Sequence, residues 1–155
     1  MTLAVHPGAL GDVLLAVPAL RALRATSGAP LMLAAQPRIG ALLETLAVVD
    51  RAVDFDSLGL DALFVDEAAS QPRLPDLSRL VCWFGARDAV FARRLKALVP
   101  GAVLAPSVGG GTAVWRHLLS TVKAPDGAWC SALEIPEGLR ADGVKALLKR
   151  LRLLA

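Results

Sequence analysis

Residues 80–84 read Leu-Val-Cys-Trp-Phe, an apolar run without a polar position. Successive side chains of a β-strand point to opposite faces of the sheet, so a strand formed here would be apolar on both faces. Such strands are typical of the interior of a parallel sheet that helices cover above and below. The run therefore predicts a doubly wound α/β fold with this strand inside the sheet.

Four further apolar runs extend this pattern along the chain: Thr2–Val5, Leu31–Ala35, Ala52–Phe55 and Ala102–Ala105. Apolar residues at helical spacing separate them around Leu20 and Leu23, over Ile39–Leu46 and over Asp88–Leu98. The alternation of short strands and amphipathic helices predicts a parallel, Rossmann-like sheet built from βαβ units. Pro18 predicts a kink or a delayed start of the first helix, because its ring removes one backbone hydrogen bond.

The chain has 155 residues, of which 55% are hydrophobic, and this length suits one domain with a substantial core. We expect that domain to span residues 1–138. In residues 139–155, leucines recur at helical spacing among lysines and arginines, which predicts a basic amphipathic helix. The high hydrophobic content also indicates that some apolar surface contacts a partner.

Composition excludes several classes of protein. No apolar run approaches the roughly 20 residues that cross a bilayer, so we expect no transmembrane helix and a cytoplasmic location. A net charge of +3 is mild, and scattered basic residues with no tyrosine disfavour nucleic-acid binding. Cys82 and Cys130 lie far apart and only two histidines accompany them, so we expect free thiols and no metal.

The loop after the first predicted strand reads His6-Pro7-Gly8-Ala9-Leu10-Gly11-Asp12. Ligands of parallel α/β sheets bind at the carboxyl ends of the strands, so this loop lies on the functional side. Gly8 and Gly11 permit positive φ and a close approach of a substrate to the backbone. Asp12 has two interpretations: it caps the following helix, or it accepts a proton from a sugar hydroxyl as a general base.

The same loop does not predict a dinucleotide site. Its glycine spacing differs from the GxGxxG pattern that the pyrophosphate turn requires. Gln36 also follows the second predicted strand, where an acid for the ribose hydroxyls would be expected. We therefore expect neither a nicotinamide nor a flavin cofactor.

Residues 8–23, GALGDVLLAVPALRAL, resemble the opening signature of glycosyltransferase family 9, the ADP-heptose:lipopolysaccharide heptosyltransferases. Weaker similarity continues over residues 49–53, over Trp83-Phe84-Gly85 with Arg87 and Asp88, and over residues 117–119. The likeness spans most of the chain, but only the first motif is specific. His6 departs from the Lys or Arg that is common before the glycine loop in this family.

The resemblance implies the N-terminal domain of a GT-B fold, in which two Rossmann-like domains face each other across a cleft. It implies that this domain binds a lipopolysaccharide-core-type acceptor, through Gly8, Ala9, Leu10, Gly11, Arg87 and Asp88. It further implies that a C-terminal domain beyond residue 155 binds a donor such as ADP-heptose. Asp12 would be the general base of an inverting transfer that needs no metal. Contact with the inner membrane would be peripheral.

Other interpretations of the same residues remain open. The domain is alternatively a non-catalytic Rossmann-like module that binds an anionic glycan or nucleotide, or pairs with a separate partner. Arg87 either binds a phosphorylated or acidic sugar bidentately or is simply solvated. The neighbours of Trp83 favour a core position over a sugar platform. His117 lies in an apolar helical stretch, which favours a hydrogen-bonded structural role.

Overall fold

Five parallel strands form a single sheet in the computed structural model, which describes residues 1–65, 71–124, 129–131 and 133. The strands are β1 (Thr2–Val5), β2 (Leu31–Ala35), β3 (Arg51–Asp54), β4 (Arg79–Cys82) and β5 (Val103–Leu104). Their order is β3-β2-β1-β4-β5, so the chain builds outward from β1 in both directions. This order is the one found in Rossmann-like sheets, and the predicted α/β class is confirmed.

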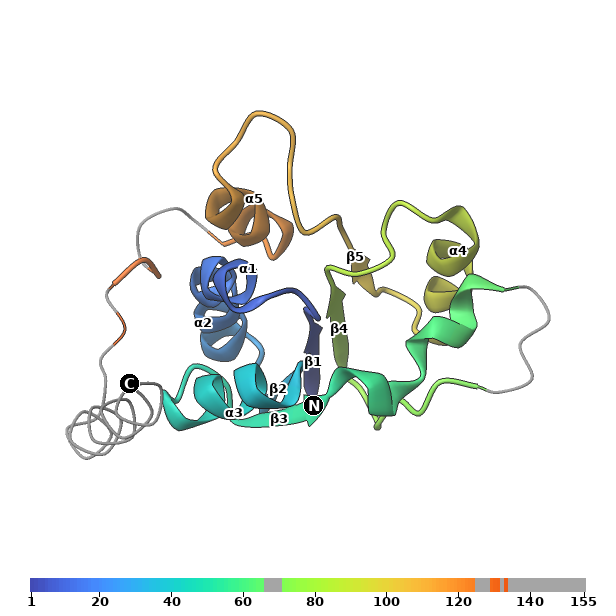
Figure 1. Ribbon diagram of the computed structural model, residues 1–155, viewed down its shortest axis with the longest axis horizontal. Coiled ribbons are helices and arrows are strands. Elements are labelled where there is room, and N and C mark those ends of the chain that lie inside the picture. The colour runs from blue at the N-terminus through green and yellow to red at the C-terminus, as the bar shows by residue number, and fades with distance from the viewer. Residues whose placement is uncertain (66–70, 125–128, 132, 134–155) are drawn as a thin grey trace, which may run out of the picture.

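Helices cover both faces of the sheet (Figure 1). One face carries α1 (Leu10–Leu15), α2 (Val17–Thr26), α3 (Pro37–Thr45) and α5 (Val114–Thr121). The other face carries α4 (Ala89–Leu98) and two short 3-10 helices, η1 (Phe55–Leu58) and η2 (Leu60–Phe64). The sheet is therefore doubly wound, as its apolar strands predict.

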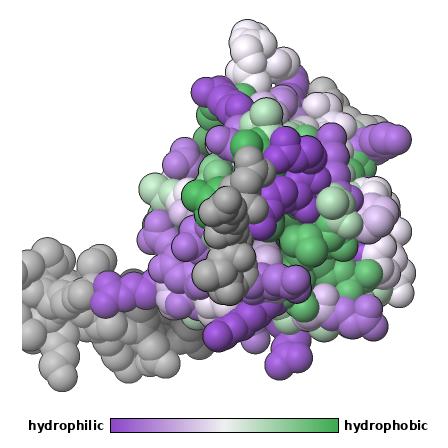
Figure 2. Space-filling model, turned by 90° about the vertical axis from the view of Figure 1, so that its right-hand side faces the viewer, coloured by the Kyte–Doolittle hydropathy of each residue, from purple (hydrophilic) through white to green (hydrophobic). Residues whose placement is uncertain are grey.

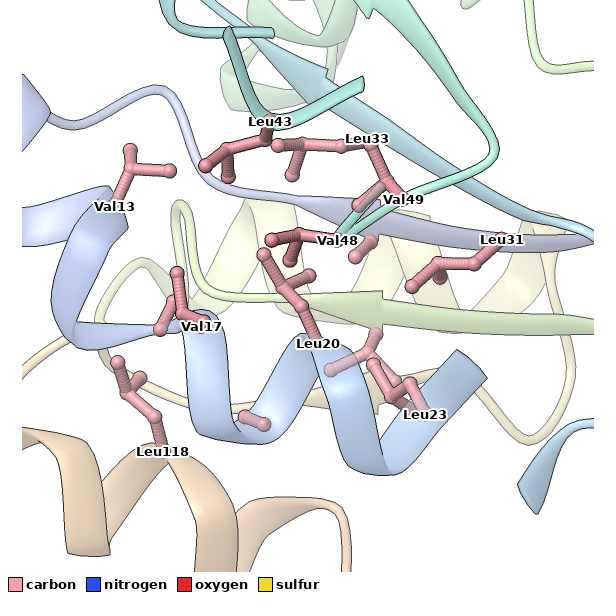
Figure 3. Close-up of a cluster of buried hydrophobic side chains, with 14 of the residues drawn as sticks. Val13, Val17, Leu20, Leu23, Leu31, Leu33, Leu43, Val48, Val49 and Leu118 are labelled. Carbon is pink, nitrogen blue, oxygen red and sulfur yellow. The ribbon is translucent and has the colours of Figure 1, made fainter. Parts of the chain in front are cut away.

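The sheet separates two hydrophobic clusters, because successive side chains of a strand point to opposite faces. In β2, Leu33 belongs to the cluster under α2, and Ala34 belongs to the cluster under α4. In β4, Val81 belongs to the first cluster and Leu80 to the second. Figure 3 shows the first cluster, where side chains of α1, α2 and α5 meet those of β2: Val13, Val17, Leu20, Leu23, Leu31, Leu33 and Leu118.

The first helical segment breaks into α1 and α2 at Ala16. Pro18 lies in the first turn of α2, where backbone N–H groups have no partner within the helix, so the N–H that proline lacks is not needed there. A continuous helix would place the Pro18 ring against the carbonyl of Leu14. The predicted interruption is confirmed, and it turns α1 into a short separate helix.

The bounds of β3, β4 and β5 differ from the predicted ones, and β5 covers Val103–Leu104 in place of Ala102–Ala105. β4 ends at Cys82 rather than Phe84, because Gly85 has φ +68° and the chain turns there toward α4. The Trp83 N–H still donates to the Val5 carbonyl at 2.9 Å, so one residue beyond β4 follows the ladder. β3 starts and ends one residue earlier than predicted, since Phe55 begins η1.

The predicted amphipathic helix and the predicted domain boundary at residue 138 lie outside the described residues. Within those residues, no helix is long and apolar enough to cross a membrane. Figure 2 looks onto the side that carries α4 and shows hydrophobic side chains gathered among hydrophilic ones. Phe64 and Leu98 are among the exposed apolar side chains of the elements on this side.

Candidate functional site

Two adjoining hollows lie where β1, β4 and β5 end. The first, the Asp12 hollow, has a volume of about 230 Å³ and is lined by His6, Pro7, Gly8, Asp12, Trp83, Phe84, Ser107, Val108 and Val114. The second, the Arg87 hollow, has a volume of about 350 Å³ and is lined by Phe64, Trp83, Phe84, Gly85, Ala86, Arg87, Asp88, Pro106, Ser107 and Val108. The two share four residues, so they form one continuous groove at the carboxyl edge of the sheet, where parallel α/β sheets bind ligands.

His6 directly follows β1 and forms part of the wall of the Asp12 hollow. Its side chain is only 2% exposed, and its ring lies 5.9 Å from the Trp83 ring, centroid to centroid. The Gly8 N–H donates to His6 Nδ1 at 3.3 Å. His6 Nε2 is buried and has no hydrogen-bond partner among the described residues. The loop thus holds an imidazole with one nitrogen satisfied and the other unpaired.

Burial lowers the pKa of His6 below its usual value, because the low-polarity surroundings disfavour the imidazolium. The negative charge of Asp12 opposes this shift and is the smaller influence. His6 is therefore neutral at neutral pH. Its Nδ1 accepts from Gly8, so the single ring proton is on Nε2.

Gly8 is required for close packing rather than for an unusual backbone angle. A Cβ at this position would lie 2.8 Å from His6 Cε1 and 3.1 Å from Asp12 Cβ. Neither Gly8 nor Gly11 has positive φ, so this loop does not use the left-handed backbone conformation that glycine permits. Because Gly8 has no side chain, the His6 ring and Asp12 Cβ can both pack close to its Cα.

Asp12 does not cap a helix. The N-cap of α1 is Ala9, which makes no side-chain cap hydrogen bond, and Asp12 is the third residue of the helix. The capping interpretation is therefore wrong. The Asp12 side chain is exposed on the wall of the hollow, and within the described part of the chain it makes no hydrogen bond or salt bridge. An unpaired carboxylate in this place is available to accept a proton from a ligand.

The Arg87 hollow is built by the turn that follows β4. Asp88 accepts a hydrogen bond from the Phe91 N–H at 2.8 Å and is the N-cap of α4. Arg87 precedes it and is exposed at the rim of the hollow. Phe64 and Phe84 form an apolar wall, with ring centroids 5.5 Å apart in an edge-to-face contact. The hollow therefore combines an aromatic wall with one guanidinium group.

The loop that separates β5 from α5 closes both hollows, and His117 anchors it. His117 Nε2 lies 2.8 Å from the Pro106 carbonyl oxygen, which confirms the predicted structural role of this histidine. A Cβ at Gly109 would lie 2.6 Å from the His117 ring, so only glycine lets the loop pass. Ser107, next to Pro106, is thereby held against the groove.

Trp83 is a core residue, as predicted. It is 3% exposed, and its Nε1–H donates to Thr121 Oγ1 at 2.9 Å. Its ring nevertheless borders both hollows. The indole thus forms the rigid floor of the groove.

The structure brings four of the predicted site residues to the groove and leaves three outside it. Gly8, Asp12, Arg87 and Asp88 line the hollows, whereas Ala9, Leu10 and Gly11 are exposed at the start of α1 and line neither. The predicted site residues included neither His6 nor Ser107, although both line the groove. For His6 the signal was present, because a polar residue directly after a buried strand lies at the functional edge of a parallel sheet.

Within the described residues, no three His, Cys, Asp or Glu side chains come together as metal ligands. Comparisons of the chain with protein-family models, with curated proteins and with solved structures found no match. The groove is therefore the part of the molecule that indicates its function. Its chemistry consists of one open carboxylate, one neutral imidazole and one exposed guanidinium group.

Proposed function

We propose that this domain is the acceptor-side half of an inverting glycosyltransferase, similar to the heptosyltransferases that its residues 8–23 resemble. The observation that supports this most strongly is the unpaired Asp12 carboxylate on the wall of a hollow at the mouth of a parallel sheet. A capping carboxylate would already be bound to backbone N–H groups. Asp12 is not, so it can act on a ligand.

In the proposed reaction, Asp12 removes the proton from an acceptor hydroxyl as that oxygen attacks the anomeric carbon of the donor sugar. The new carbon–oxygen bond forms while the bond to the nucleoside diphosphate breaks on the opposite face, and the anomeric configuration inverts. The proton stays on Asp12, and the leaving diphosphate carries away the electron pair. General base catalysis of this kind contributes a factor of about 10²–10⁴ in rate.

Arg87 has a separate part in this proposal. Its guanidinium group, at the rim of the neighbouring hollow, binds a phosphate or carboxylate of the acceptor. A lipopolysaccharide-core-type acceptor carries such groups, and it would extend along the groove from Asp12 to Arg87. A facing domain would present the nucleotide-sugar, an ADP-heptose-like donor, and the reaction would take place at the cytoplasmic face of the membrane.

The first test is binding by the whole 155-residue chain, measured by calorimetry with a deacylated lipopolysaccharide-core oligosaccharide. We expect Arg87→Ala to weaken binding about tenfold, because one charge-assisted contact is lost. Asp12→Asn, which keeps the size of the side chain, should change binding less than about twofold. Asp61→Asn is the matched control, since Asp61 is exposed on η2 and lines neither hollow.

The second test is turnover in a two-domain enzyme that contains this chain. Asp12→Asn should reduce transfer to the acceptor about 10²–10⁴-fold, and Asp61→Asn should leave it unchanged. Turnover that survives Asp12→Asn would contradict the proposed mechanism. Oligosaccharide binding without any detectable turnover of the two-domain enzyme would favour the alternative, a non-catalytic glycan-binding module.

A further inference from the structure

The Asp12 hollow contains a second polar group that the proposed function does not use. His6 is 2% exposed, and its Nε2 has no partner within the described part of the molecule. The Gly8 N–H occupies Nδ1 as a donor, so Nε2 carries the ring proton and needs an acceptor. Buried donors without a partner are rare, and each one calls for a physical explanation.

The position of Nε2 provides that explanation. The ring edge that holds Nδ1 and Cε1 packs against Gly8, where a Cβ would lie 2.8 Å from Cε1 and 3.1 Å from Asp12 Cβ. Cε1, which is bonded to Nε2, therefore faces the side of Gly8 on which Asp12 Cβ lies. His6 and Asp12 are both lining residues of this hollow. A histidine with an unpaired buried donor and an aspartate with an unpaired acceptor therefore line the same small cavity.

We propose that His6 binds the acceptor sugar directly, its Nε2–H donating to one hydroxyl oxygen while Asp12 accepts from an adjacent hydroxyl. This inference rests on the proposed function and specifies its substrate: a sugar ring with two neighbouring free hydroxyls. An uncharged diol is a suitable partner for a neutral, buried imidazole. Charged groups of the acceptor would instead bind to Arg87 in the adjoining hollow.

The volume of the Asp12 hollow suits a single sugar ring. Its volume of about 230 Å³ is smaller than the roughly 300–1,000 Å³ typical of sites for drug-sized ligands. A terminal monosaccharide unit fits such a volume better than an oligosaccharide chain does. The longer part of the acceptor would follow the shared wall of Trp83 and Phe84 toward Arg87.

Two variants separate the donor at Nε2 from the structural role of Nδ1. His6→Asn retains an oxygen that accepts from the Gly8 N–H but places no donor where Nε2 lies. His6→Gln is long enough to place an amide N–H close to the position of Nε2. We expect His6→Asn to weaken binding of the deacylated lipopolysaccharide-core oligosaccharide about tenfold and His6→Gln to restore it to within about threefold.

A direct readout comes from NMR of the full chain with ¹⁵N-labelled histidine. The chain has two histidines, so His117, bound to Pro106, is an internal control. Saturating oligosaccharide should shift the His6 Nε2–H resonance downfield and slow its exchange with water, with no change at His117. A merely structural His6 would give no such response.

The outcomes are distinguishable. If the oligosaccharide binds with Arg87-dependent affinity but His6 Nε2 does not respond, or if His6→Asn binds as tightly as the unchanged chain, the inference fails alone. If the oligosaccharide does not bind at all, the proposed acceptor class fails and the inference fails with it. A response of His6 Nε2 together with rescue by His6→Gln supports the inference, even if turnover proves independent of Asp12.

Discussion

The loops after β1 and β4 begin alike and end differently. Each runs from a glycine and an alanine to an aspartate at the start of a helix: residues 8–12 after β1 and residues 85–88 after β4. Asp88 accepts from the Phe91 N–H and caps α4. Asp12 lies one residue further from its glycine, falls in the third position of α1, and caps nothing. The first loop therefore leaves its carboxylate unpaired at the groove, whereas the second uses its carboxylate to start a helix.

The two glycines show the same division. Gly85 has φ +68° and packs against the Phe91 ring, so it serves the turn into α4. Gly8 has an ordinary φ and packs between His6 and Asp12, so it serves the site. The comparison teaches that Gly85 and Asp88 stabilise the turn into α4, whereas Gly8 and Asp12 shape the Asp12 hollow. Substitution of Gly85 or Asp88 should therefore lower the stability more than substitution of Gly8 or Asp12 does.

The largest effect is expected from the glycines. In Gly85→Ala, the new Cβ would lie 2.5 Å from Phe91 Cδ1 in a backbone conformation that L-residues rarely adopt. Overpacking and left-handed strain together should lower the free energy of unfolding by about 3 kcal/mol. Gly8→Ala, with ordinary φ and a contact to the movable His6 ring, should cost about 1–2 kcal/mol. Urea denaturation of the chain measures both.

Gly11→Ala is the control for this pair. No atom lies within 4 Å of a Cβ at Gly11, and its φ is not positive. Because Gly11 lies within α1, alanine should raise the free energy of unfolding by about 0.5–1 kcal/mol. A larger loss from Gly8→Ala than from Gly85→Ala would contradict the division of roles between the two loops.

Apolar patterning predicted the fold well, because each buried strand is apolar on the faces it buries. β1 and β2 match their predicted bounds, whereas β4 ends two residues before its apolar run does. Trp83 and Phe84 lie beyond the end of β4: Trp83 packs into the core, and both residues also border the groove. Hydrophobicity alone cannot distinguish a strand residue from a pocket residue.

The site was harder to predict than the fold. Sequence indicates that Asp12 and Asp88 both follow strands, but the helix register decides which one caps, and register depends on the tertiary position of α1. The importance of His6 depends on which of its nitrogens is satisfied. That follows from the Gly8 N–H contact, which spacing along the chain does not reveal.

A smaller effect is expected from the aspartates. Asp88→Ala removes a helix cap and should lower the free energy of unfolding by about 1 kcal/mol. Asp12→Ala removes an exposed side chain without a hydrogen bond, so the change should stay below about 0.5 kcal/mol. Thermal and urea denaturation measure both variants. Equal losses would mean that Asp12 has a structural role, and the comparison of the loops would fail.

The last prediction concerns the reactivity of the Cys82 thiol at the end of β4 and involves no substitution. Burial raises the pKa of its thiol to about 12, because the low-polarity surroundings disfavour the thiolate, and the S–H donates to the Phe84 carbonyl at 3.3 Å. The thiolate is the nucleophile, so at about pH 8 the native chain should react with iodoacetamide at the exposed Cys130 and not at Cys82. Denaturant should expose both thiols, as mass spectrometry will show. Rapid labelling of Cys82 in the native chain would mean that the end of β4 opens readily. That result would contradict the comparison, in which the end of β4 is buried and the loop after β1 borders an open hollow.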